Sequence, residues 1–366
     1  MEAHRPVELN SHPAQRNRPP GYAIADRPRR PVIPPANPKP ERLQGTIRQN
    51  PKKDVTLSAH RPPITHWLIA TRPQFLTAMA LPVLLGTAFA WHDGHPFAPL
   101  PFIMAIIAGI LLHAAANVVN DIIDHQRGAD PLNTDPLTPF AGGSRSIQTG
   151  RLTVAQMRQL ALMLLGIATV LGIGLILLAG WPLLWIGIVG LLIGLGYSAG
   201  PWPLNYHGLG EPAIAITFGL LTVAGSYFTQ AQGFTPQAWL LGLPVGLLAA
   251  AILLVNEFPD APSDAKAGKQ TWVVLFGPKK ARAALGALLL LPFVILIGGT
   301  LAGLWPAMTL IALLALPLAF QGWCRTPAIA NTNQARLPGI KAVIASHALF
   351  TLLLTLGLIA QGIMNG

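Results

Sequence analysis

The sequence predicts an all-α, polytopic membrane protein with about nine transmembrane helices around a central cavity and with cytoplasmic cap loops. Three observations predict this class. Of the 366 residues, 52% are hydrophobic and only 11% are charged, whereas an average soluble domain has about 25% charged residues. The apolar residues form stretches long enough to cross a bilayer, and all Lys and Arg residues fall on one side of the resulting spans.

Residues 1–65 are basic and rich in proline, as in "RPRRPVIPPANPKP", and their longest apolar run is "YAIA". Such a composition predicts a disordered cytoplasmic tail that precedes a transmembrane domain at 66–366. The tail lacks the apolar core and cleavage site of a secretory signal, and its acids and prolines are unlike those of a transit peptide. Binding of this tail to anionic lipid is an open alternative to a simply solvated extension.

From Trp67 onward the chain divides into apolar stretches that match the roughly 30 Å of hydrocarbon that a helix must cross. Strands are disfavoured, because the stretches are long, rich in Leu, Ala and Gly, and not alternating. The expected spans are 67–91, 99–119, 157–179, 181–199, 212–229, 238–255, 283–302, 304–323 and 343–363.

The distribution of Lys and Arg predicts the orientation, because these residues concentrate in short cytoplasmic loops. With the N-terminus inside, the inside segments hold 13, 4, 5 and 3 of them, which is all 25 in the chain. The outside connections and the C-terminus hold none. The expected location is therefore the cytoplasmic (inner) membrane, with the N-terminus in the cytoplasm.

Beyond the tail, eight of nine acidic residues lie on this cytoplasmic side, and they form two similar motifs. Asn-Asp-x-x-Asp at 120–124 ends the second span, and Asn-Glu-x-x-Asp at 256–260 ends the sixth. Residues at i and i+3 or i+4 share a helix face, so a polar stripe should run along the last turns of span 2, formed by His113, Asn117, Asn120 or Asp121, and Asp124. Solvated helix ends would explain one such motif, but hardly two copies; Asp130 and Asp135 could each be solvated.

Hard oxygen ligands that leave room for substrate phosphates are what Mg²⁺ prefers. The candidate metal ligands carry −6, and a diphosphate adds about −3. Two Mg²⁺ ions and four nearby cations, Arg127, Arg145, Lys266 and Lys269, return +8. The charges nearly balance only when metal and an anionic substrate are both present. The candidate ligands are Asp121, Asp124, Asp130, Glu257, Asp260 and Asp264.

These motifs resemble the UbiA superfamily of intramembrane polyprenyltransferases, whose signature is two Asp-rich motifs at the cytoplasmic ends of spans 2 and 6. The resemblance covers nearly all of residues 66–363, including "NVVNDIIDHQRGAD", "GGSRSIQTGRL", "GYSAGP", "GLGE" and "NEFPDAPSDAKAGKQT". Within the superfamily it is most similar to the branch that prenylates 1,4-dihydroxy-2-naphthoate in menaquinone synthesis, whose first motif places Gly and then a later Asp, here Gly128 and Asp130, after Asp124.

The resemblance implies a Mg²⁺-dependent transfer of a polyprenyl group from polyprenyl diphosphate to an aromatic acceptor, with no part for nucleic acid. It implies catalytic roles for Asp121, Asp124, Asp260 and Asp264. The metals and nearby cations would stabilise the departing diphosphate, and the electron-rich ring would attack the allylic carbon in a cavity that excludes water. The residues expected to bind substrate are Asn117, Asn120, Arg127, Arg145, Tyr197, Asn256, Lys266 and Lys269.

One loop departs from the family pattern. Relatives usually carry a Lys after Gly-Pro and an Arg before Gly-Leu-Gly-Glu, whereas "YSAGPWPLNYHGLGE" has neither. Tyr197 and Tyr206 could hydrogen-bond substrate there or could only pack. Another acceptor, such as 4-hydroxybenzoate, is an alternative within the same chemistry. A membrane carrier is the alternative outside it, although a carrier should have its ionisable residues near the bilayer midplane.

The single cysteine, Cys324, excludes an intramolecular disulfide and a Cys-based zinc site. It is expected to be a buried or reduced spectator thiol.

Overall fold

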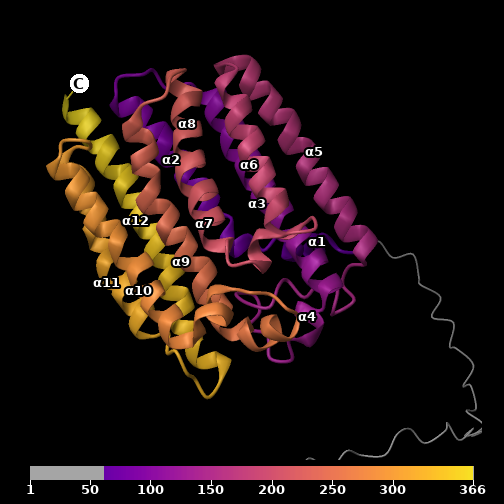
Figure 1. The fold of residues 1–366 in the computed structure, drawn as a ribbon. Helices are drawn as coiled ribbons and strands as arrows, with labels where there is room; N and C mark the ends of the chain where they lie inside the picture. The colour runs from indigo at the N-terminus through magenta and orange to yellow at the C-terminus, as the bar shows by residue number, and fades with distance from the viewer. Residues whose placement is uncertain (1–61, 366) are drawn as a thin grey trace, which may run out of the picture. The chain divides into compact units, whose positions relative to one another are not determined.

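The computed structural model describes residues 62–365, and the tail predicted for residues 1–65 lies almost entirely outside them. The described residues are nearly all helical and contain no strand, which confirms the predicted fold class. Figure 1 shows the long helices side by side, with the short helix α4 at the end of the bundle opposite to the C-terminus.

The first half of the bundle begins with a short helix ahead of the first span, followed by four long helices, two of which start at prolines. Pro99 and Pro182 each occupy the first helical position, where the missing N–H costs nothing. Thr153 and Gln156 form a capping box at the start of the third long helix. The elements are α1 Ile64–Ala70, η1 Pro73–Phe75, α2 Thr77–His92, α3 Pro99–Arg127, α4 Ala129–Leu132, α5 Val154–Ala179, α6 Pro182–Ser198 and η2 Leu204–Tyr206.

The second half contains a helix with a π-helical turn and a helix broken at a glycine. In α10 the backbone of Gly277 is non-helical, with φ of 77°, so Trp272–Phe276 is a separate short turn. The elements are α7 Gly210–Ile214, η3 Ala215–Leu221, α8 Thr222–Ala231, α9 Pro236–Lys266, α10 Trp272–Leu301, η4 Ala307–Ala315, α11 Leu316–Cys324, η5 Asn333–Arg336 and α12 Leu337–Asn365.

Eight helical segments within residues 62–365 are long and apolar enough to cross a membrane. The remaining predicted span, the fourth at 181–199, corresponds to α6, a 17-residue apolar helix about 26 Å long at 1.5 Å per residue. The helices α3 and α9 are much longer than predicted, with 29 and 31 residues. Both acidic motifs therefore lie on continuous helix, about 44 and 46 Å long, and not in loops.

The predicted sixth span ends at residue 255, whereas α9 continues to Lys266 and passes through two prolines, Pro259 and Pro262. Both lie inside α9, although a proline removes a backbone hydrogen bond and usually ends a helix. Because α9 continues through them, Glu257, Asp260 and Asp264 lie on one helix at spacings of three and four residues, and so close to one face.

The packed core fixes the position of α9. Its main cluster joins α2, α9, α10 and α12 around buried residues such as Leu248, Leu285 and Phe350, and a second cluster joins α3 to α5. On another side α9 contacts η3 so closely that the Gly242 Cα faces the Gly219 carbonyl, leaving no room for a Cβ on either residue. The helix that carries the second motif is thus held on several sides.

Candidate active site

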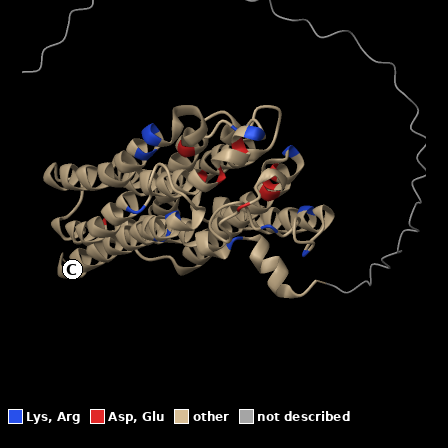
Figure 2. Ribbon diagram, turned by 90° about the horizontal axis from the view of Figure 1, so that it is seen from below, with Lys and Arg blue, Asp and Glu red and all other residues tan. Residues whose placement is uncertain are grey.

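The ends of α3 and α9 border one large cavity of about 600 Å³. Its wide apolar part is lined by residues of α3, α5, α6 and η3, such as Leu165, Ile186 and Phe218. Its polar head contains predicted site residues from both motifs and from nearby positions: Asn117, Asn120, Asp124, Asp130, Tyr197, Asn256, Glu257, Asp260, Asp264 and Lys269. In Figure 2 acidic residues gather together, with Lys and Arg residues around them.

The loop between α4 and α5 connects the two motifs. Asn133 Nδ2 donates to Asp260 Oδ1 at 2.8 Å, and the Gly142 N–H donates to Asp260 Oδ2 at 2.8 Å. Two residues further on, the Ser144 N–H donates to Asp121 Oδ2 at 2.9 Å. One loop therefore orients a carboxylate of each motif, and both carboxylates accept charge-assisted hydrogen bonds.

Gly143 lies between two carboxylates of the first motif. A Cβ at this residue would be 3.1 Å from Asp121 Oδ1 and 3.0 Å from Asp130 Oδ2. Its φ of 74° also belongs to the left-handed region that favours glycine. The absence of a side chain here lets Asp121 and Asp130 approach the same point, beside the cavity head.

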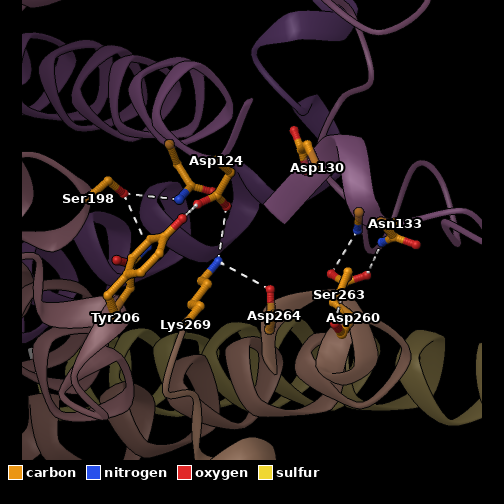
Figure 3. Close-up of polar contacts among 12 residues, drawn as sticks. Asp124, Asp130, Asn133, Ser198, Tyr206, Asp260, Ser263, Asp264 and Lys269 are labelled. Atoms are coloured by element: carbon orange, nitrogen blue, oxygen red, sulfur yellow. Dashed lines mark hydrogen bonds and ion pairs between the residues drawn. The ribbon is translucent and has the colours of Figure 1, made fainter. Parts of the chain in front are cut away.

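Lys269 joins the motifs on the other side of the cavity head. Its Nζ lies 3.0 Å from Asp124 Oδ2 and 3.9 Å from Asp264 Oδ1 (Figure 3). Burial alone would lower the pKa of Lys269, but the two carboxylates outweigh it and raise the pKa well above its usual value. The side chain is therefore a partly buried ammonium that neutralises part of the acidic cluster.

Asp124 has a second partner in Tyr206, whose hydroxyl donates to Asp124 Oδ1 at 3.0 Å. Burial, and then the neighbouring Asp124 carboxylate, raise the pKa of Tyr206 above its usual value. The phenol thus stays protonated and remains a hydrogen-bond donor.

Asp130 lies apart from these pairs in Figure 3. Its Oδ2 accepts from Gln148 Nε2 at 3.1 Å. Burial raises the pKa of Asp130 to about 8, and the negative charges of Asp121 and Asp124 add to the effect. A carboxyl group with this pKa is mostly protonated at neutral pH, and a bound cation would favour its charged form.

The amides at the cavity head are held in different ways. Asn117 Nδ2 donates to the Thr71 carbonyl at 3.0 Å. Asn120 and Asn205 both donate to Ser198 Oγ, at 3.0 and 3.3 Å. The Asn120 side chain is thereby fixed beside α6, with its carbonyl oxygen left for other partners.

Three of the predicted substrate-binding cations are not among the residues that line the cavity. Arg127 is exposed and donates to the Gly200 carbonyl at 3.1 Å. Arg145 donates to the backbone carbonyl of Asp130 at 2.6 Å, and Lys266 is exposed. Charge counting along the sequence could not distinguish cations that reach the cavity from those at its rim.

The sequence reasoning missed Arg72, which lines the cavity. It was counted only as a charge flanking the first span. Arg72 adopts a left-handed conformation with φ of 56°, and one guanidinium nitrogen donates to the Phe140 carbonyl at 3.2 Å. Its Nε has no partner among the described residues. Asn133, Ser144, Ser198 and Asn205 were missed as well, although "GGSRS" was noticed as a family-like segment.

The oxygen atoms at the cavity head suit a hard cation such as Mg²⁺ that also binds water or substrate phosphates. Three buried oxygens of the two motifs have no hydrogen-bond partner within the described part of the chain: Asp121 Oδ1, Asn256 Oδ1 and Glu257 Oε2. Asn256 and Glu257 line the cavity, whereas Asp121 is not among its lining residues. Within residues 62–365 no three His, Cys, Asp or Glu side chains lie close enough together to hold a metal ion by themselves. Mg²⁺ binds through one or two carboxylates together with water and substrate phosphates, so these residues fit a metal site that a phosphorylated substrate completes.

The match to known proteins covers most of the chain. Residues 79–337 match the UbiA prenyltransferase family. A protein of Escherichia coli (strain K12) named 1,4-dihydroxy-2-naphthoate octaprenyltransferase is 33% identical over 258 residues, which cover 69% of this chain and 82% of that protein. The protein of the same name from Bacillus subtilis (strain 168) is 30% identical, over 79% of this chain and 90% of its own length.

A solved structure supports the fold. The UbiA homolog from Archaeoglobus fulgidus bound to GPP and Mg²⁺ superposes with a TM-score of 0.58 at 18% identity, covering 81% of this chain and 99% of its own. The apo UbiA homolog from Aeropyrum pernix K1 gives the same TM-score at 19% identity, over 78% and 97% of the two chains. Together with the sequence matches, this arrangement of helices and acidic motifs places the chain in the UbiA prenyltransferase family, as a multi-pass membrane prenyltransferase.

Proposed function

We propose that this enzyme transfers a polyprenyl group from polyprenyl diphosphate to 1,4-dihydroxy-2-naphthoate, as in menaquinone biosynthesis, with Mg²⁺ as cofactor. The observation that carries the proposal is the joining of two acidic motifs, through one loop, at the head of a single apolar cavity. Relatives named for this naphthoate reaction match the chain at about 30% identity, and a solved relative binds GPP and Mg²⁺.

Acidic and basic residues would bind the diphosphate in different ways, the acids through a metal ion and the cations directly. Asp121, Asp124, Asp130, Glu257, Asp260 and Asp264 would hold Mg²⁺, as the sequence analysis expected. When bound, the metal neutralises the diphosphate and stabilises it as a leaving group. Lys269 and Arg72 add positive charge on the protein side, where charge-assisted hydrogen bonds to phosphate oxygens are strong.

The apolar part of the cavity holds the prenyl tail and keeps water from the reacting carbon. As the bond between the allylic carbon and the diphosphate breaks, the electron-rich ring supplies the electrons for the new carbon–carbon bond. Ring attachment to the naphthoate is accompanied by loss of its carboxylate as CO₂. Exclusion of water prevents hydrolysis of the allylic centre, which a site open to bulk solvent would not do.

A ring panel tests the acceptor. Purified protein is incubated with Mg²⁺, one prenyl diphosphate and either 1,4-dihydroxy-2-naphthoate or 4-hydroxybenzoate, and the products are weighed by mass spectrometry. The proposal expects a prenylated product that has lost CO₂ with the naphthoate, and little or no product with the benzoate. Preferential prenylation of 4-hydroxybenzoate would overturn the acceptor assignment while leaving the reaction class intact.

Chelation should abolish the reaction. If the carboxylates bind the diphosphate only through a divalent cation, excess EDTA leaves like charges facing one another and no turnover follows. Activity should return when Mg²⁺ is restored, and unchanged near-UV circular dichroism shows that EDTA did not unfold the protein. Full turnover in excess EDTA would contradict the metal-dependent mechanism.

We also propose that the N-terminus faces the cytoplasm, because Lys and Arg lie on that side. Single cysteines replace Asp93, Asp135, Gln232 and Lys279, all of which are exposed, in a chain whose exposed Cys324 is changed to Ser. In sealed cells an impermeant thiol reagent should label positions 93 and 232 but not 135 and 279. The reverse labelling would invert the orientation.

A further inference from the structure

Tyr206 lies outside both acidic motifs but contacts residues from two other parts of the site. It belongs to η2, in the connection between α6 and α7, and is only 4% exposed. Its hydroxyl donates to Asp124 Oδ1 at 3.0 Å, and its carbonyl accepts from the Gln270 N–H at 3.2 Å. Tyr206 thus links the end of α3 to the segment that follows α9.

Two cations approach the ring of the same tyrosine. The guanidinium carbon of Arg127 lies 4.7 Å from the ring centroid, and Lys269 Nζ lies 5.5 Å from it. Both distances are within the range of cation–π attraction. The α6–α7 connection contains no Lys or Arg of its own. The Tyr206 ring therefore holds two cations, Arg127 of α3 and Lys269 after α9, beside a loop that has no cation of its own.

The surroundings hold Tyr206 in place. Trp272 Nε1 donates to the Gly208 carbonyl at 2.9 Å, which ties the loop to the start of α10. The rings of Trp202 and His207 stack with centroids 4.4 Å apart. The tyrosine hydroxyl therefore reaches Asp124 from a constrained loop, and not from a freely moving side chain.

We propose that Tyr206 is a positioning residue for diphosphate binding: its hydroxyl fixes the Asp124 carboxylate, and its ring fixes Lys269 and Arg127. This role rests on the proposed function. Asp124 accepts from Tyr206 through Oδ1 and from Lys269 through Oδ2. With both oxygens held, the carboxylate keeps one orientation while its remaining lone pairs face other ligands. Tyr206 is not among the residues that line the cavity, so it acts through Asp124 and Lys269.

The chain provides a matched control for this proposal. Tyr227 is also 4% exposed, and its hydroxyl donates to Asp93 Oδ2 at 2.8 Å. In this second pair the tyrosine is equally buried, whereas the carboxylate of Asp93 is exposed, and neither residue belongs to an acidic motif. Tyr206→Phe and Tyr227→Phe remove the same hydroxyl and the same kind of bond, but only the first change affects a proposed site residue. Tyr206→Leu additionally removes the ring that faces Arg127 and Lys269.

Two readouts separate positioning from general damage. The first uses the Tm of the protein in the presence of an inert prenyl thiodiphosphate. A ligand that binds only the folded state raises stability by mass action, so Mg²⁺ added with this ligand should raise Tm. The readout is the Mg²⁺ concentration that gives half of the maximal rise. The second is KM for prenyl diphosphate and, separately, for the aromatic ring. The Tm of each variant without ligand shows whether the variant is folded.

Tyr206→Phe should raise the half-saturating Mg²⁺ concentration and the KM for prenyl diphosphate by about tenfold to a hundredfold, which is what loss of a hydrogen bond to a charged group produces. The KM for the ring should stay within about twofold of the wild-type value. Tyr206→Leu should show a larger shift than Tyr206→Phe, and Tyr227→Phe should show none in either binding readout.

A Tyr206→Phe protein with wild-type values in both readouts would overturn the proposal, as would an equal shift in Tyr227→Phe. Equal increases in KM for both substrates would also overturn it, since they indicate general loosening. A wild-type protein that binds the thiodiphosphate but prenylates no ring would overturn the proposed reaction alone, and the Tm readout would still decide the role of Tyr206. A wild-type protein that does not bind the thiodiphosphate would overturn both.

Discussion

Asp121→Asn should lower the rate of prenyl transfer by at least about a hundredfold. The asparagine side chain has the same size and can still accept the Ser144 N–H through its amide oxygen, as Asp121 Oδ2 does at 2.9 Å. The change removes the negative charge and the unpartnered Oδ1 proposed to bind metal. Loss of a metal contact that stabilises a leaving group costs several kcal/mol, and each 1.36 kcal/mol is about tenfold in rate.

The control for this change is Asp135→Asn. Asp135 is exposed, and only its backbone carbonyl accepts a hydrogen bond there, from Asn333 Nδ2 at 2.9 Å. Because a solvated surface charge contributes little, this variant should stay within a few-fold of wild type. The comparison uses initial rates at matched amounts of protein in the membrane. An equal loss of rate in Asp121→Asn and Asp135→Asn would contradict the assignment of Asp121 as a metal ligand and Asp135 as a solvated acid.

Gly143→Ala is expected to have the second largest effect, a loss of about tenfold to a hundredfold in rate. A Cβ at residue 143 would lie 3.0 Å from Asp130 Oδ2 and 3.1 Å from Asp121 Oδ1, so one or both carboxylates must move. Small displacements of catalytic groups have effects of this size. The measurement is the rate at saturating substrate together with the Mg²⁺ concentration that gives half the maximal rate.

Gly150→Ala separates displaced carboxylates from backbone strain. Gly150 has a φ of 69°, close to the 74° of Gly143, but a Cβ there meets nothing within 4 Å among the described residues. Both alanines carry the conformational cost of the left-handed region, about 1–2 kcal/mol. Only Gly143→Ala should change the Mg²⁺ dependence. A similar change in Gly150→Ala would mean that strain in the loop, and not contact with the carboxylates, is responsible.

Much of the fold could be predicted because hydropathy reports directly on the bilayer. Runs of apolar residues predicted the helices and their order, and the clustering of acids predicted a site at the ends of spans 2 and 6. The sixth span was predicted to end at residue 255, where the apolar run ends, whereas α9 continues to Lys266. The close packing of α9 against η3 at Gly242 and Gly219 joins residues more than twenty positions apart, a contact that no local sequence pattern shows.

The details of the candidate site depended on contacts that no local pattern reveals. Asn133 and Asp260 are 127 residues apart in the sequence, yet they share a 2.8 Å hydrogen bond. Arg72 was counted only with the basic residues ahead of the first span, but it lies between α1 and η1 with a left-handed backbone and lines the cavity. Conversely, Lys266 lies only three residues from Lys269 but is exposed, whereas the Lys269 side chain is only 13% exposed and forms an ion pair with Asp124. The direction of a side chain at a helix end is decided by tertiary packing.

A structure of the purified protein in lipid with Mg²⁺ and an inert prenyl thiodiphosphate tests the central claim most directly. The account predicts metal density between the diphosphate and carboxylates of both motifs, Asp121 and Asp124 on α3 and Asp260 and Asp264 on α9, with the prenyl tail in the apolar cavity. A diphosphate bound elsewhere, or held by Arg and Lys residues alone with no metal against either motif, would contradict it.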